Sequence, residues 1–140
     1  MIIDISEAYL IIKICLAAIL GMIIGYEREI HLKPAGLRTH TLVCMGSCLF
    51  AVLSLEFVGD SARIAAGIVT GIGFLGAGAI FQYKDKVRGL TTAADLWVIA
   101  AVGLAVGIGM YTAAIITTVL IFIILEYGRT FEQKALNKKK

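Results

Sequence analysis

The chain has 140 residues, of which 59% are hydrophobic and 16% are charged, and its mean hydropathy is +0.91. A soluble domain carries about 25% charged residues and needs polar surface to cover its core. The composition therefore argues against a soluble protein and favours one that lies in a lipid bilayer. The net charge of +3 comes from basic residues beside apolar segments, where anionic headgroups attract them, so no nucleic-acid partner is expected.

Apolar runs of suitable length predict five membrane-spanning helices. A bilayer core of about 30 Å requires about 20 mostly apolar residues per helix. The segment from Leu96 to Leu125 carries no charge but is too long for one upright helix. Gly103, Gly107 and Gly109 lie where a turn would divide it. The expected spans are residues 8–26, 39–55, 64–83, 92–108 and 110–127.

The placement of basic residues tests the number of spans. Lys and Arg favour cytoplasmic loops, and eleven of the thirteen lie within residues 27–38, 84–88 and 129–140. With five spans these three regions share one side of the membrane, whereas four spans would separate the last from the second. We therefore expect an all-α bundle of about five transmembrane helices with its N-terminus outside. Residues 1–128 would form the transmembrane domain and residues 129–140 a basic cytoplasmic tail.

The third expected span contains a glycine motif. Gly71, Gly73 and Gly76 spell G-x-G-x-x-G, which binds a dinucleotide when it follows a strand. Here the motif lies within an uncharged apolar segment, so nucleotide binding is not expected. Small residues instead let membrane helices approach closely. Gly67, Gly71 and Gly78 share one helical face and the other two lie opposite, which predicts that this helix is packed on both sides at the centre of the bundle. Some of these contacts could instead serve dimerisation.

The second expected span carries a weakly polar stripe. His40, Cys44 and Ser47 lie at helical spacing, and one interpretation is local hydrogen bonding and packing. The other is that His40 titrates near neutral pH and senses protons or contacts a partner. Spacing does not decide between these two. The three cysteines of the chain have no metal-binding spacing, so we expect them to pack as small apolar side chains.

An acidic residue near the start of the fourth expected span has two interpretations. Thr92 and Asp95 form a capping-box pattern, which gives the carboxylate a structural role. An ionisable group inside a span is also a candidate for function, and Arg28 or Arg38 could pair with it. On a helical wheel Asp95 falls beside Ile99 rather than with the small residues. That orientation suits an interfacial cap or an intersubunit contact better than a site buried within one bundle.

Charges elsewhere have simpler interpretations. Glu56 and Asp60 lie in a short outer loop and could hold a hydrated magnesium ion. Alternatively, Asp60 caps the third span while Arg63 pairs nearby. Lys13 lies about five residues from the outer end of its span, from where it could extend to the headgroups. The sequence contains no recognised catalytic motif, so we do not expect an enzyme.

Four ordered blocks resemble the MgtC/SapB family of bacterial membrane proteins. The resemblance covers residues 16–111 and implies a cytoplasmic-membrane protein associated with survival at low magnesium, with growth inside host cells and, in some members, with acid tolerance. In some members it implies restraint of the proton-driven ATP synthase. Several members add a soluble C-terminal ACT-like domain, which we expect this chain to lack. The blocks are Gly25–Arg28, Pro34–His40, Gly71–Gly78, and Gly89–Ala94 followed by Trp97.

The resemblance also implies which polar positions matter. With the topology above, most of them gather at the cytoplasmic face, where we expect a compact polar cluster that includes Asp95. The implied positions are Glu27, Arg28, Arg38, Thr39, His40, Asp60, Arg63, Thr91 and Thr92.

The sequence is compatible with two functions, regulation of another membrane protein and transport of a cation. Transporters place polar ligands near the membrane midplane, and the centres of these spans offer no carboxylate. We therefore expect a non-enzymatic regulator that docks on another membrane protein, such as the ATP synthase, and that forms homo-oligomers. The alternative is a transporter or channel for magnesium or another cation, in which several copies line a pore with their glycine-rich helices.

Overall fold

The computed structural model describes residues 5–55, 61–83 and 86–137, which form five long helices and a short β-hairpin. Each helix is long and apolar enough to cross a bilayer. The prediction of an all-helical fold with five spans is therefore confirmed, while the membrane side of each end stays a prediction. The elements are α1 (Ile5–Ile30), α2 (Leu37–Leu55), α3 (Ser61–Ala79), β1 (Phe81–Tyr83), β2 (Lys86–Arg88), α4 (Leu90–Gly107) and α5 (Tyr111–Asn137).

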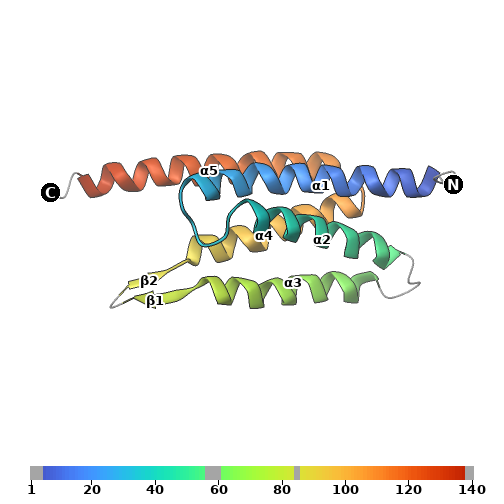
Figure 1. Cartoon of the computed structure of the whole chain (residues 1–140), viewed down its shortest axis with the longest axis horizontal. Coiled ribbons are helices and arrows are strands. Elements are labelled where there is room, and N and C mark those ends of the chain that lie inside the picture. The colour runs from blue at the N-terminus through green and yellow to red at the C-terminus, as the bar shows by residue number, and fades with distance from the viewer. Residues whose placement is uncertain (1–4, 56–60, 84–85, 138–140) are drawn as a thin grey trace.

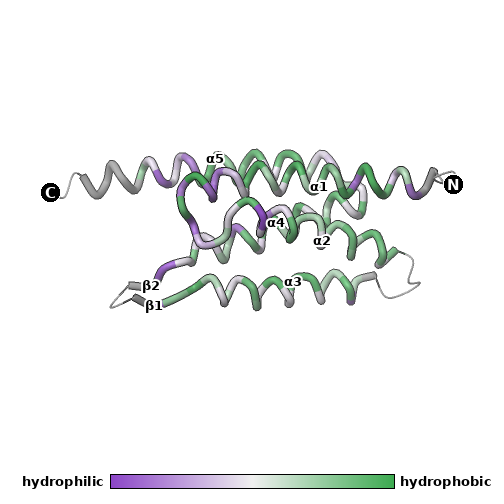
Figure 2. Tube along the Cα trace, viewed as in Figure 1, coloured by the Kyte–Doolittle hydropathy of each residue, from purple (hydrophilic) through white to green (hydrophobic). Residues whose placement is uncertain are grey.

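Successive helices run in opposite directions, as Figure 1 shows. The α1–α2 connection, the β-hairpin and the C-terminal part of α5 consequently lie at the same end of the bundle. We call this the polar end, because hydrophilic residues concentrate there (Figure 2). All three regions that carry most of the basic residues thus come together.

Helix α4 lies at the centre of the bundle and packs against each of the other four helices. Half of its apolar span is buried, whereas only 11% of the span in α3 is buried. Helix α3 lies at the edge in Figure 1 and packs mainly against α4 and α2. The prediction that the glycine-rich third span occupies the centre is therefore wrong.

Glycines in the other helices make the close contacts. A Cβ atom on Gly25 would lie 2.7 Å from the Cα of Leu37, and one on Gly103 would collide with the carbonyl oxygen of Cys44. These glycines let α1 and α4 approach the backbone of α2.

The packing role expected for the α3 glycines is not seen within this chain. Gly76 makes an ordinary contact with Ala93, at 3.5 Å from an added Cβ atom to that of the alanine. At the other positions an added Cβ atom would meet no described atom within 4 Å. These open positions are Gly67, Gly71, Gly73 and Gly78.

The third span is shorter than expected because a hairpin follows it. Helix α3 ends at Ala79, and Phe81 pairs with Arg88 in the antiparallel hairpin. Aromatic and β-branched residues in both strands favour extended backbone. Gly89 then turns the chain into α4 with φ of 86°, a conformation that glycine adopts readily. A Cβ atom at Gly89 would collide with the carbonyl oxygen of Ala79.

Candidate functional site

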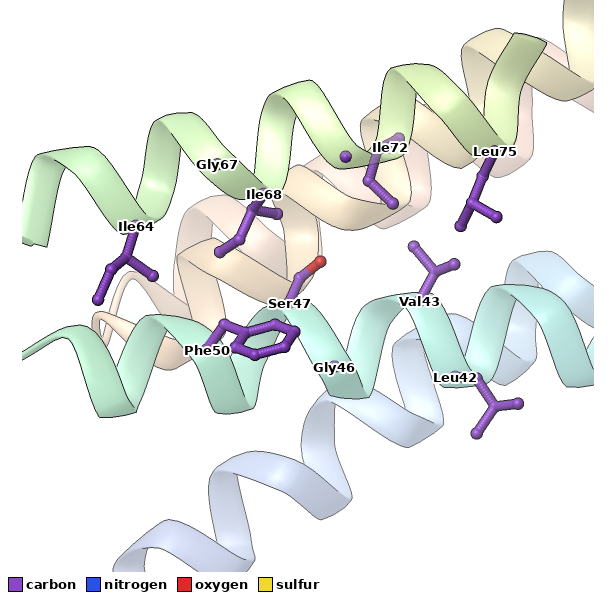
Figure 3. A pocket seen from close by; sticks show the side chains of 11 residues that line it. Leu42, Val43, Gly46, Ser47, Phe50, Ile64, Gly67, Ile68, Ile72 and Leu75 are labelled. Atoms are coloured by element: carbon purple, nitrogen blue, oxygen red, sulfur yellow. The ribbon is translucent and has the colours of Figure 1, made fainter. Parts of the chain in front are cut away.

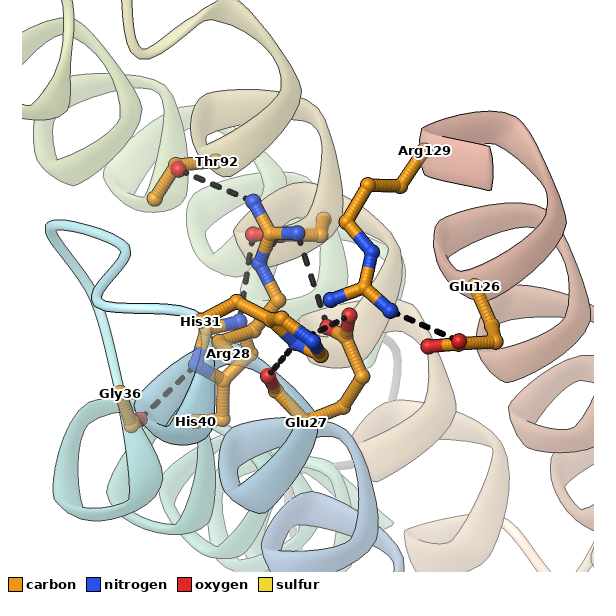
Figure 4. Close-up of polar contacts among 9 residues, drawn as sticks. Glu27, Arg28, His31, Gly36, His40, Thr92, Glu126 and Arg129 are labelled. Atoms are coloured by element: carbon orange, nitrogen blue, oxygen red, sulfur yellow. Dashed lines mark hydrogen bonds and ion pairs between the residues drawn. The ribbon is translucent and has the colours of Figure 1, made fainter. Parts of the chain in front are cut away.

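Four ionisable side chains and one threonine from α1, α2 and α4 are buried together at the polar end (Figure 4). Each is at most 4% exposed. Charged groups inside a membrane protein are costly unless they pair with one another, and the contacts below show that these do. We call the set the buried cluster; its members are Glu27, Arg28, His40, Thr92 and Asp95.

Asp95 joins the three helices. Its Oδ2 atom lies 2.7 Å from Nε of Arg28 on α1, and its Oδ1 atom lies 3.1 Å from Nε2 of His40 on α2. The expected capping role is wrong, because the N-cap of α4 is Gly89 and no side chain caps that end. An intersubunit position is also wrong, since Asp95 is buried. The helical wheel failed because α4 is buried on its large apolar face as well, where Ile99 is 0% exposed.

Arg28 holds the cluster together from the last turn of α1. Besides its contact with Asp95, its Nη2 donates to Oγ1 of Thr92 at 3.3 Å, and its Nη1 lies 3.6 Å from Oε2 of Glu27. The planar guanidinium presents several donors in fixed directions, so one side chain contacts both α4 and its own helix. A cation in the last turn of a helix is also favoured by the helix dipole.

His40 lies in the first turn of α2 and is completely buried. Its Nδ1 atom is 2.9 Å from the carbonyl oxygen of Gly36, one turn earlier. Its Nε2 atom faces Asp95. The turn through Pro34 and Gly36 therefore places this ring between the backbone of α2 and the carboxylate of α4.

A partly exposed ion-pair layer, which sequence reasoning missed, flanks Glu27. Nδ1 of His31 lies 2.7 Å from the carbonyl oxygen and 3.0 Å from Oε1 of Glu27. On α5, Arg129 donates to Glu126 at 2.7 Å. The spacings i,i+4 and i,i+3 could have suggested each pair. The meeting of α1 and α5 seen in Figure 4 depends on the tertiary fold.

Three of these side chains could supply metal ligands. Ligand atoms of Glu27, His31 and Glu126 lie within 4.8 Å of one another. A set with imidazole suits a transition metal better than magnesium, which prefers oxygen ligands. However, Arg28 and Arg129 already pair with the two carboxylates. A divalent cation would have to displace both guanidinium groups, so the arrangement favours an ion-pair network.

Other predicted positions lie outside the buried cluster. Arg38 and Thr91 are exposed, and Thr39 is half-buried. Arg38 and Thr39 line a polar cavity of about 350 Å³ at the polar end. Thr91 lines a neighbouring cavity of about 420 Å³ beside Arg28 and Lys33. These three side chains are placed to contact solvent, headgroups or another protein.

The predicted outer polar group is only partly visible. Arg63 is exposed in the first turn of α3, at the end of the bundle away from the polar end. Glu56 and Asp60, the expected magnesium ligands, lie outside the described residues.

Lys13 is buried near the other end of α4, not extended to the membrane surface. Its Nζ atom donates to the carbonyl oxygen of Gly107 at 2.8 Å and lies 5.0 Å from the ring centroid of Tyr9. The carbonyl groups at the end of a helix carry partial negative charge. Lys13 therefore caps the C-terminus of α4, which corrects the prediction that it extends to the headgroups.

An apolar cavity of about 570 Å³ lies between α2 and α3, which also contact each other (Figure 3). Side chains such as Val43, Phe50 and Ile68 line it, together with open glycines of both helices. Ser47 contributes a polar oxygen. The lining suits hydrocarbon and offers few groups that could replace the water of a hydrated cation.

Curated proteins are similar to this chain over most of its length. The chain is 47% identical to the "Putative magnesium transporter YhiD" of Escherichia coli (strain K12), over 94% of this chain and 66% of that protein. It is 52% identical to "Protein MgtC" of Brucella abortus (strain 2308), over 76% of this chain and 47% of that protein. It is 46% identical to "Protein MgtC" of Salmonella typhimurium (strain 14028s / SGSC 2262), over 79% and 48% respectively. The chain thus spans about half to two thirds of the length of these relatives.

The family comparison covers most of the chain. No solved structure matches it at a significant level. The model of the MgtC family matches residues 14–134. This range includes all five members of the buried cluster and the whole of α4. This chain, a multi-pass membrane protein related to bacterial MgtC, therefore belongs to the MgtC family.

Proposed function

We propose that this chain is a non-enzymatic protein of the bacterial inner membrane that regulates another membrane protein. The regulation would serve magnesium homeostasis and stress adaptation, and the link to magnesium fits the name of the Escherichia coli relative. The ATP synthase is one candidate partner, and the protein would act as a homo-oligomer. The C-terminus and the polar end would face the cytoplasm, in keeping with the distribution of basic residues.

The observation that carries this proposal is the closed apolar interior between the buried cluster and Lys13. Cys44, Ile99, Val102 and Val106 are each at most 1% exposed along this stretch. Magnesium gives up its water shell reluctantly and requires oxygen ligands to replace it. In the described part of the chain, a single copy therefore offers the ion no polar route along the axis of the bundle.

The outer face of α3 supports an interaction with another protein. Gly73 and Gly78, which do not line the cavity toward α2, meet no described atom, and Phe74 next to Gly73 is 84% exposed. Small residues on a membrane helix allow a second helix to approach closely. A regulator that works by docking needs such an unoccupied face, whereas the buried charged groups at the polar end are paired within the chain.

Magnesium flux tests the proposal directly. Purified protein would be reconstituted into liposomes that hold a magnesium-sensitive dye, with empty liposomes as the control. We expect no dye response above that of the empty liposomes after external magnesium is added. A larger response that is lost in Asp95→Asn or Arg38→Gln would refute the regulatory function and favour transport.

Docking requires its own test. A photo-crosslinking amino acid would be placed at Phe74 on α3 or, as a matched control, at Ile12, which is 63% exposed on α1. In cells grown at low magnesium, we expect position 74 to crosslink to one membrane protein and position 12 to crosslink to lipid. Equal protein crosslinking at both positions would count against a specific surface on α3.

The second candidate function is transport of magnesium or another cation. The name of the Escherichia coli relative favours it. Because the interior of one copy is closed, such a pathway would form between copies, with backbone carbonyls near the α3 glycines as ligands. The same flux assay distinguishes the two functions.

A further inference from the structure

The ring of His40 lies between two hydrogen-bond acceptors. Nδ1 is 2.9 Å from the carbonyl oxygen of Gly36, and Nε2 is 3.1 Å from Oδ1 of Asp95. A neutral imidazole has one N–H group and one lone pair, whereas a carbonyl oxygen can only accept. A neutral ring that donates to the carboxylate would therefore point its lone pair at the carbonyl oxygen of Gly36. Only a further proton removes this conflict.

The contacts of Asp95 decide where the further proton lies. Its Oδ2 atom is 2.7 Å from Nε of Arg28, which is a close ion-pair contact between two buried groups, although neither of these two atoms forms a hydrogen bond with a described residue. Arg28 is always charged, so it holds Asp95 as a carboxylate. We propose that His40 is an imidazolium in the folded protein, donating from both ring nitrogens, and that this proton is a structural ligand of the buried cluster.

The charge balance of the cluster agrees with this assignment. Glu27 and Asp95 contribute two negative charges and Arg28 contributes one positive charge, so a neutral His40 would leave the buried cluster with a net charge of −1. An imidazolium brings the sum to zero. Because an uncompensated buried charge is strongly destabilising, the proton supplies the missing positive charge.

The neighbouring charged groups pair with Glu27 or with one another. On α2 itself Arg38 is exposed to solvent. On α5 Glu126 and Arg129 neutralise each other. His31 on α1 is partly exposed and is directed to Glu27. The packed elements thus present His40 with Asp95 as its direct ionic partner.

Proton binding is therefore coupled to helix packing at the polar end. When His40 loses its proton, negative charge remains where α1, α2 and α4 meet, and the contact of α2 with α4 weakens. Raising the pH loosens this junction and lowering the pH tightens it. The inference is independent of the proposed regulatory function, because it concerns the ligand that completes the cluster.

Nitrogen NMR tests the protonation state without reference to function. The chain has two histidines, so the variant His31→Gln leaves His40 as the sole imidazole. In detergent micelles at neutral pH, we expect both ring nitrogens of His40 to carry a proton and to show slow solvent exchange. A spectrum with one protonated and one bare nitrogen would overturn the proposal.

Two further variants connect the proton to its partners. In Asp95→Asn on the His31→Gln background, His40 loses its ionic partner and should become singly protonated; a ring that stays doubly protonated would contradict the assignment. In His31→Gln, the thermal midpoint of unfolding should fall as the pH rises from mildly acidic to alkaline. His40→Gln on that background should lack this step. An identical pH dependence with and without His40 would exclude the coupling.

Discussion

The glycines of α4 and α3 should respond in opposite ways to the same added methyl group. At Gly103 on α4, a Cβ atom would collide with the carbonyl oxygen of Cys44 and lie 3.0 Å from Cβ of Ser47. At Gly71 on α3, it would meet no described atom within 4 Å. Gly103→Ala and Gly71→Ala therefore form a matched pair in which only the surroundings differ.

The expected magnitudes follow from two opposing terms. Overpacking costs about 1–3 kcal/mol, and the upper part of that range applies at Gly103 because the colliding atom belongs to helix backbone that cannot rotate away. Alanine is favoured over glycine inside a helix by about 1 kcal/mol. The free energy of unfolding should thus fall by about 1–2 kcal/mol in Gly103→Ala. It should rise by up to about 1 kcal/mol in Gly71→Ala.

Unfolding in detergent micelles provides the assay. Titration with a denaturing detergent can be followed by the fluorescence of Trp97, the sole tryptophan. Equal losses of stability in the two variants would refute the view that α4 is closely packed and α3 is open. A loss confined to Gly71→Ala would refute it more strongly.

Three further predictions concern the polar and charged groups. Arg28→Ala should lower the free energy of unfolding by about 3–5 kcal/mol, because buried carboxylates lose their partner. Arg129→Ala, which breaks a partly exposed pair, should cost less than about 1 kcal/mol; similar losses would contradict the burial of the cluster. Lys13→Met should cost about 1 kcal/mol through loss of the α4 cap, so an unchanged denaturation midpoint would count against that cap. In a cysteine-free background, Arg38→Cys and Thr91→Cys should react with an impermeant thiol reagent from the cytoplasmic side; labelling from outside alone would reverse the proposed orientation.

The five helices were predictable because the bilayer imposes a length and a hydropathy on each crossing. The hairpin at Phe81–Arg88 was not predictable in this way, since strands of three residues are too short to show a period. The third apolar run therefore appeared to continue to Tyr83. Its final residues are extended.

The candidate site was harder to derive because its contacts join distant segments. The motifs and topology indicated that Arg28, His40 and Asp95 share one end of the bundle. They did not reveal that Asp95 is buried, because the wheel of α4 was interpreted as if only its small residues faced neighbours. A central helix has neighbours on most sides, so residue size does not identify its exposed face.

The charges of α1 also have a consequence for biogenesis. During synthesis α1 emerges before α4, yet Arg28 and Lys13 find their partners on α4, at Asp95 and Gly107. A Lys or Arg in a lone helix costs about 2.5–3.5 kcal/mol to insert at the bilayer centre and less toward the helix ends, where Arg28 and Lys13 lie. Helix α1 is therefore inserted less stably until α4 is synthesised. Asp95 and the carbonyl oxygen of Gly107 then bind Arg28 and Lys13, toward the two ends of α1. A polypeptide truncated before α4 would leave these cations in contact with lipid, and membrane proteases that monitor unassembled segments could recognise it.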